Sequence, residues 1–267
     1  MGDNGKGFKQ ARERLGESKY NNDNELMKII VYNNATDIVI EFQDKYKARV
    51  STRYSNFKNG SVKNPYHKNK FGGYYGQGKY KTKINEKHTE EYKIWHDMLR
   101  RCYDPYFLDK EPSYIGCSVC DEWLNFQNFA KWYEENYYKC NNERMHLDKD
   151  IICKGNKIYS PQNCCFVPQR INALFIKRDI DRGEYPLGVC KKPYDNSLLC
   201  YCGILDENKK YRRIHLGVFP LNKPFQAFYT YKIFKENYIK QVADEYKDII
   251  PQKLYEALYK YEVEIND

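Results

Sequence analysis

Residues that could carry metal-dependent chemistry are concentrated between positions 146 and 172 of this chain. Asp148 and Asp150 supply two carboxylates, and His146 shares their side of an extended strand because alternate residues point the same way. Two amides follow: Asn163 lies 15 residues after Asp148, and Asn172 lies 9 residues after Asn163. Carboxylate and amide oxygens are ligands that Mg²⁺ and similar cations prefer, and a neighbouring imidazole could take a proton from water.

The segment 146–175 also has the elements needed to position these side chains. A short strand ends in polar residues, Gly155 and Asn156 provide a tight loop, and Ser160-Pro161 marks a turn before an apolar strand. Pro168 stands where the first turn of a helix accepts proline. The sequence therefore predicts a strand–loop–strand–helix unit of about thirty residues.

This layout resembles the HNH family of nucleases, in which a β-hairpin and a helix hold one divalent metal ion. The resemblance matches Asp148 to the family's acid, Asn163 to its middle asparagine and Asn172 to the ligand on its helix. It implies a Mg²⁺ or Mn²⁺ cofactor held by Asp148 and Asn172, with Asn163 fixing the loop. The implied activity is hydrolysis of a phosphodiester bond in DNA.

One position departs from the family pattern. The histidine that follows the acid and acts as general base is Lys149 here. A lysine between two carboxylates stays protonated, so Lys149 is a poor base, though a good phosphate contact. His146 or Asp150 is then the candidate for activating water. In the alternative interpretation, cleavage is slow or absent and the unit only holds DNA.

The cysteines offer a second, weaker metal signal. Cys117 and Cys120 have the spacing of a zinc-ligand pair, but no second such pair or paired histidine completes a set of four. No secretory signal precedes the ten cysteines, so we interpret them as reduced, small buried hydrophobes. Structural zinc is the less favoured interpretation.

The segment 186–232 has a different pattern, three strand-like runs (188–191, 198–205 and 211–219) followed by a long helix from about 222. It resembles the DNA-binding domain first known from plant ethylene-response factors, on Gly188-Val189, the stretch 215–219 and Ala227-x-Tyr229. In that family a three-stranded sheet lies in the major groove and the helix packs behind it. Carried over by position, the implied DNA contacts are Lys191, Lys192, Tyr194, Tyr201, Lys210, Arg212 and Arg213.

The N-terminal segment is strand-rich and then strongly basic. Runs 26–32 and 37–42 flank an Asn-rich turn and 47–51 continues the sheet, which predicts a small β-barrel-like module over about residues 15–65. From Lys45 to Asn85 there are eleven Lys or Arg and no Asp or Glu. A stretch of one sign repels itself, which favours an anionic partner. The candidate contacts in this stretch are Lys63, Lys68, Lys70, Lys79 and Lys81.

The overall composition is consistent with a polyanion partner. The formal net charge is +9, from 45 Lys or Arg against 36 Asp or Glu. Such an excess favours polyanionic partners, because neutralised phosphates release counterions, and the two resemblances imply that the polyanion is double-stranded DNA. No run of apolar residues is long enough for a membrane span, and we expect a soluble, cytoplasmic protein of a bacterial host cell without a membrane partner.

These segments together predict a multi-module α+β protein. Residues 1–85 form a basic β-rich module with a linker, 86–180 an HNH-like ββα-metal domain with two preceding helices, and 181–267 a three-stranded sheet with a helix. The first preceding helix starts at Thr89, with Trp95, Met98, Leu99 and Cys102 on one face, and the second covers about 124–138. A last helix over 251–259 could pack on the preceding domain or serve a homodimer.

Three functional hypotheses follow from this organisation. The leading one is a metal-dependent endonuclease or nickase of the phage-encoded HNH homing type. The second is a catalytically silent DNA-binding or regulatory protein that retains the fold. The third is a phage factor that blocks a host defence protein, with the basic patches meeting an acidic surface.

Overall fold

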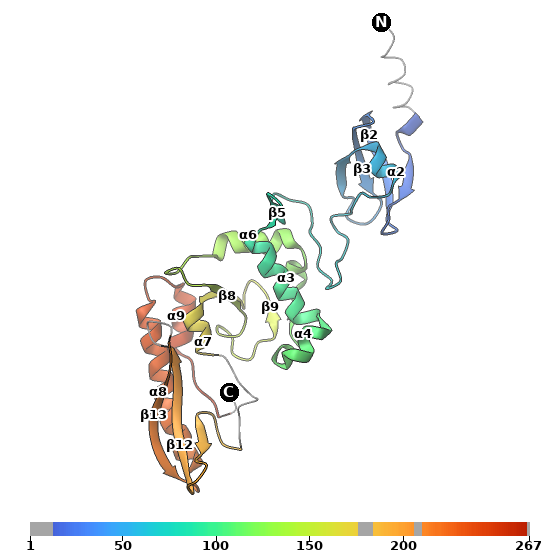
Figure 1. Cartoon of the computed structure of the whole chain (residues 1–267). Coiled ribbons are helices and arrows are strands. Elements are labelled where there is room, and N and C mark those ends of the chain that lie inside the picture. Colours follow the sequence, from blue (N-terminus) through green and yellow to red (C-terminus); the bar gives the residue numbers. More distant parts are fainter. Residues whose placement is uncertain (1–12, 176–183, 206–209, 266–267) are drawn as a thin grey trace. The chain divides into compact units, whose positions relative to one another are not determined.

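The computed structural model describes residues 13–175, 184–205 and 210–265 as a mixed α+β protein with several separate sheets (Figure 1). The chain divides into two compact units, Met1–Tyr133 and Glu134–Asp267. The predicted boundary at 180 and the predicted turn at 206–208 lie outside the described residues. Each unit is described by itself.

The first unit begins with a four-stranded antiparallel sheet in the order β1-β2-β3-β4. Its strands are β1 Ser18–Tyr20, β2 Leu26–Asn34, β3 Asp37–Phe42 and β4 Arg49–Thr52. Alternate residues on β2 and β3, among them Met27, Ile29, Ile38 and Ile40, are buried under Phe57 of the short helix α2, Tyr54–Lys58. The predicted hairpin is therefore present.

The predicted barrel-like closure is wrong. In the described part of the chain, β1 and β4 are the two edges of an open sheet, and no ladder joins them. Four short strands are too few to close, since even the smallest common barrels need about eight or a tightly coiled five. The apolar face is covered by α2 and not by the sheet itself.

The rest of the first unit is mainly helical. Its elements are β5 Lys83–Ile84, β6 Lys87–His88, α3 Glu90–Tyr103, α4 Pro105–Lys110, the 3₁₀ turn η1 Pro112–Tyr114, β7 Ser118–Val119 and α5 Asp121–Leu124, and the unit ends within α6 Phe126–Asn136. The predicted stripe on α3 is confirmed, because Trp95, Met98, Leu99 and Cys102 are all buried. The second predicted helix is interrupted at Asn125, which separates α5 from α6.

The second unit contains the predicted strand–loop–strand–helix segment. Its elements are β8 Met145–Asp148, β9 Ile158–Tyr159, β10 Cys165–Pro168 and α7 Gln169–Ala173. Strands β8 and β10 pair antiparallel, with Asp148 opposite Cys165 and His146 opposite Val167. Helix α7 follows β10 without a loop and packs on both strands.

The three-stranded sheet with its helix is also present. Its elements are β11 Val189–Lys191, β12 Ser197–Leu205, β13 Tyr211–Pro220 and α8 Pro224–Glu245, followed by α9 Gln252–Tyr259. The order is β11-β12-β13, antiparallel. Leu198, Cys200 and Cys202 of β12 face Ala227 and Phe228 of α8 in a buried core.

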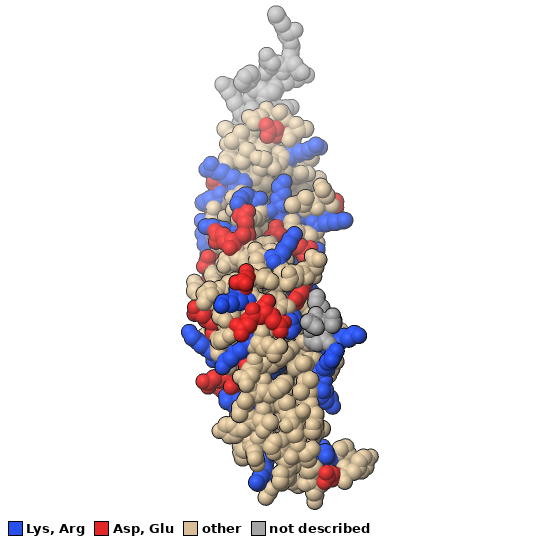
Figure 2. All heavy atoms as spheres, turned by 90° about the vertical axis from the view of Figure 1, so that its left-hand side faces the viewer, with Lys and Arg blue, Asp and Glu red and all other residues tan. Residues whose placement is uncertain are grey.

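Helix α8 is apolar on more than one side. Its residues 224–231 include no charged residue, and Phe225, Tyr229 and Ile233 are exposed at intervals of one turn. Figure 2 shows a face on which charged side chains become sparse toward the bottom, the level at which β12 and β13 are labelled in Figure 1. In the described residues, none of the helices is long and apolar enough to cross a membrane.

Candidate functional site

The hairpin of β8 and β10 brings two candidate residues to one face. Met145 and Leu147 of β8 are buried, whereas His146 and Asp148 are partly exposed, as strand alternation requires. The extended strand ends at Asp148, so the expectation that Asp150 continues it is not met. Asp150 instead lies in the turn that follows, and its backbone N–H donates to Asp148.

The Asp148 side chain is hydrogen-bonded to the backbone of the turn that follows it. Its Oδ1 accepts hydrogen bonds from the backbone N–H groups of Asp150 at 2.9 Å and Ile151 at 2.8 Å. Burial raises the pKa of the Asp148 carboxyl to about 6, and the negative charge of Asp150 adds to this rise, although the two N–H donors oppose it. A carboxyl whose ionised form is disfavoured in this way is a group whose charge a bound cation would stabilise.

The Lys149 side chain, which we expected to contact phosphate, does not lie on an open surface. It is buried, its Nζ lies 3.3 Å from Oδ2 of Asp150, and it stands over the ring of Tyr159 at 5.8 Å from the centroid. The predicted phosphate contact by Lys149 would require release from Asp150. In this arrangement the lysine partly neutralises the neighbouring carboxylate.

Asn163 holds the loop between the strands. Its Nδ2 donates to Oδ1 of Asn156 at 3.1 Å, and Asn156 Nδ2 in turn donates to the carbonyl oxygens of Lys149 at 2.7 Å and Ile158 at 2.8 Å. These bonds fasten the strand end that carries Asp148 to the start of β9. Asn156, which the sequence indicated only as a loop residue, is the centre of this network.

His146 and Asn172 have side-chain atoms available for chemistry. Nε2 of His146 lies 2.9 Å from Oε1 of Gln169, the first residue of α7. Asn172, partly exposed on α7, makes no side-chain hydrogen bond within the described residues. Sequence reasoning missed Gln169, whose position directly after Pro168 was the available signal.

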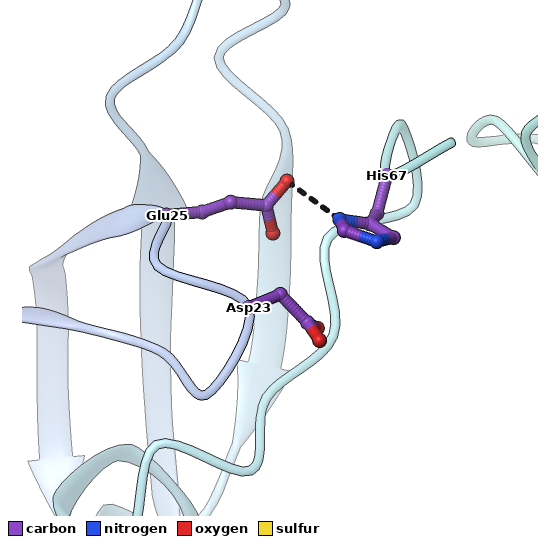
Figure 3. Close-up of side chains that lie close together, drawn as sticks. All are labelled: Asp23, Glu25 and His67. Carbon is purple, nitrogen blue, oxygen red and sulfur yellow. Dashed lines mark hydrogen bonds and ion pairs between the residues drawn. The ribbon is translucent and has the colours of Figure 1, made fainter. Parts of the chain in front are cut away.

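The three-ligand cluster that the described residues form lies elsewhere, in the first unit. Asp23 and Glu25 from the turn before β2 face His67, with ligand atoms within 4.8 Å of one another (Figure 3). Glu25 Oε1 lies 3.2 Å from His67 Nδ1, and Lys63 Nζ lies 2.8 Å and 3.0 Å from the two oxygens of Asp23. Because Lys63 already supplies a cation, this cluster is an ion-pair network that ties residues 63–67 to the sheet.

The cysteines form no such cluster in the described part of the chain. Cys117 is buried and Cys120 is half-buried. Neither belongs to the three-ligand cluster of Asp23, Glu25 and His67. Burial raises the pKa of the Cys120 thiol, which disfavours the thiolate that a metal would need.

The sheet face turned away from α8 carries cationic and aromatic groups. Cross-strand pairing places Tyr201 opposite His215, Gly203 opposite Arg213 and Leu205 opposite Tyr211. The Arg213 guanidinium stands 4.3 Å from the Tyr201 ring centroid, and Tyr211 lies over Gly203, where a Cβ would be 2.5 Å from its hydroxyl. Tyr211 and His215 were absent from the predicted set, although they alternate with Arg213 along β13.

The other predicted contacts of this domain lie at its margins. Arg212 pairs with Ile204, and exposed Lys191 pairs with Leu198, so both belong to the strand positions on the α8 side. Lys192 Nζ lies 3.7 Å from Asp195 Oδ2, and Tyr194 is fully exposed in the turn between β11 and β12. Lys210 is exposed just before β13.

The predicted N-terminal lysines differ in the groups that their side chains contact. Lys63 is paired with Asp23, Lys68 is exposed, and Lys70 and Lys79 lie over the rings of Phe71 and Tyr80. Lys81 is exposed beside a groove together with Lys83, which the prediction omitted.

Comparison of the chain with protein-family models, curated proteins and solved structures finds no match.

Proposed function

We propose that this protein is a DNA-binding, divalent-metal-dependent endonuclease or nickase of the HNH type. One observation carries the proposal: α7, which carries the partly exposed Asn172, packs on the β8–β10 hairpin, which carries the partly exposed Asp148, and within the described residues Asn172 makes no side-chain hydrogen bond. A carboxylate oxygen and an amide oxygen are donors of the kind that Mg²⁺ and Mn²⁺ prefer.

The residues of the hairpin have separate roles in this proposal. A cation held by Asp148 and Asn172 would stabilise charge on the scissile phosphate as a Lewis acid. Because Oε1 of Gln169 accepts from Nε2 of His146, the other ring nitrogen, Nδ1, is left with a lone pair that can take a proton from water. Asn163 keeps the loop, and therefore Asp148, in place through Asn156.

The open face of the C-terminal sheet supplies the DNA contacts in this proposal. Arg213 offers charge to phosphate or hydrogen bonds to bases, and its stacking on Tyr201 orients it. The first turns of α8 carry no charge, so the sheet face is the better surface for a polyanion.

Plasmid nicking in Mg²⁺ or Mn²⁺ tests the catalytic half. We expect the wild-type chain to convert supercoiled DNA to the open-circular form, and Asp148→Ala to lower this rate about a hundredfold or more, the usual effect of losing a metal ligand or charge-stabilising group. His146→Ala tests the base, and activity unaffected by either substitution would contradict the proposed site.

A second candidate function is duplex binding without cleavage. It is favoured by Lys149, which is buried on Asp150 where the family pattern has its base. This candidate predicts salt-dependent, metal-independent duplex binding with no nicking. The variant Lys149→His separates the two: nicking gained only in the variant would mean that the wild-type chain is a silent binder.

A further inference from the structure

The first unit contains an open groove of about 530 Å³ formed largely by the basic stretch itself. Its volume lies within the range of about 300–1,000 Å³ typical of ligand sites. It is lined by Lys63, Asn64, Pro65, Tyr75, Gly76, Gln77, Gly78, Tyr80, Lys81, Thr82, Lys83 and Gln127. The lining includes three lysines and no carboxylate.

The Gly/Tyr segment that forms one wall is docked on the helices and is not a loose linker. Tyr74 N–H donates to Leu124 O at 2.8 Å, and its carbonyl accepts from Phe126 N–H at 2.9 Å. Gly76 has φ +68°, and a Cβ there would stand 2.3 Å from Oδ1 of Asn125. Glycine is therefore required for both the conformation and the close approach.

The side chain of Gln127 on α6 holds the same wall through hydrogen bonds to its backbone. Its Oε1 accepts from Tyr80 N–H at 3.0 Å, and its Nε2 donates to the carbonyls of Tyr75 at 3.3 Å and Tyr80 at 2.9 Å. A Cβ on Gly78 would lie 2.2 Å from that Oε1. The groove is consequently held in one shape before any partner binds, which reduces the entropy lost on binding.

The far wall is fixed on the start of α3. Thr89 stands at the N-cap position, but its hydroxyl donates to Lys81 O at 3.1 Å instead of capping the helix, and its N–H donates to Thr82 O at 3.1 Å. This anchoring holds the backbone that carries Lys81 and Lys83. Both side chains are exposed and have no ion-pair partner in the part of the chain that the structure describes.

Two positive charges without ion-pair partners among the described residues, on a rigid, polar, open groove, favour a polyanion as the partner. Tyr75, 44% exposed and packed on Tyr92 and Trp95, adds a flat surface on which a sugar or base can lie. We propose that this groove binds the sugar–phosphate backbone of DNA, with Lys81 and Lys83 on phosphates. The proposal rests on the proposed function, since it gives the same enzyme a second DNA anchor distant in sequence from Asp148.

Duplex binding by the full chain, measured by fluorescence anisotropy over a range of salt concentrations, tests the groove. The double substitution Lys81→Gln and Lys83→Gln is expected to weaken binding about tenfold near 0.15 M salt and to reduce the slope of log affinity against log salt by about 2. Asp23→Asn releases Lys63 from its ion pair and is expected to tighten binding and steepen the slope by about 1.

Lys87→Gln is the matched control, because Lys87 is an exposed lysine on the paired strand β6 and does not line the groove. Suppose that the wild-type chain binds DNA with an affinity that falls steeply as salt rises, and that the double variant has the same affinity as Lys87→Gln. The groove assignment is then wrong while the proposed function stands. If the wild-type chain binds no DNA but binds an acidic protein through Lys81 and Lys83, both the groove assignment and the proposed function are wrong. Equal loss of nicking and binding in the double variant supports the groove as an anchor.

Discussion

Two β-structures backed by helices lie in the second unit, and they use polar residues in opposite ways. In the β8–β10 hairpin, Asp148, Lys149 and Asn163 are engaged with their own loop. In the sheet of β11–β13, Arg213 and Tyr211 stand on the face opposite α8. Changes to the hairpin should therefore alter stability and function together, whereas changes to the open sheet face should alter binding alone.

The largest expected change in the free energy of unfolding comes from substituting two glycines with positive φ, one in the hairpin segment and one beside the three-stranded sheet. Gly188 has φ +77°, and a Cβ there would stand 2.0 Å from the buried ring of Tyr231, whereas Gly155 has φ +79° and no atom within 4 Å. Gly155→Ala should cost about 1 kcal/mol and Gly188→Ala about 3 kcal/mol or more, measured by urea unfolding. Equal costs would show that packing on α8 does not restrict Gly188.

The asparagine network of the hairpin should have the next largest effect. Asn156→Ala removes two donated bonds and two accepted bonds, and Asn163→Ala removes one donated bond. We expect losses of about 2–3 and about 1 kcal/mol, since each net hydrogen bond contributes about 1 kcal/mol. Nicking should fall with Asn156→Ala even at temperatures where the variant is folded, because Asp148 would lose its fixed loop.

The raised pKa of Asp148 predicts a pH dependence of stability in the presence of a chelator. The folded value of about 6 exceeds the ordinary value of 3.8, so the folded state holds the proton more tightly. The stabilisation is complete below pH 4 and is lost as the pH rises through 6. Asp148→Asn keeps the acceptor for the two N–H donors and lacks the charge, so it should be about 1–2 kcal/mol more stable than wild type at pH 7.

A wild-type stability that stays level between pH 4 and pH 7 would contradict this account of Asp148. Added Mn²⁺ should stabilise the wild-type chain at pH 7 and leave Asp148→Asn unchanged, because ligand binding to the folded state shifts the unfolding equilibrium.

The smallest effect on stability is expected on the open sheet face. Arg213→Gln should change the free energy of unfolding by less than about 0.5 kcal/mol, while duplex affinity falls about fivefold, or about 1 kcal/mol. Melting temperature and anisotropy measured on the same preparation separate the two quantities. A large loss of stability would mean that the Arg213–Tyr201 stack supports the sheet.

Local patterns determined most of the elements. Alternation in 26–42 predicted the first hairpin and the 3.6-residue stripe predicted α3, because burial of one face depends only on near neighbours in the sequence. The 146–173 unit was predicted for the same reason. The barrel was predicted wrongly, because sheet closure depends on edges distant in sequence.

The sequence by itself determined which residues are chemically able to act: the acids, amides and histidine of 146–172 and the acid-free basic stretch. Only the tertiary structure decided which of them are available. It placed Lys149 on Asp150 and Lys63 on Asp23, and left Asn172, Lys81 and Lys83 without such partners in the described residues. The physical reason is that charge and hydrogen-bonding capacity belong to the residue, whereas their neutralisation depends on neighbours that folding brings from elsewhere in the chain.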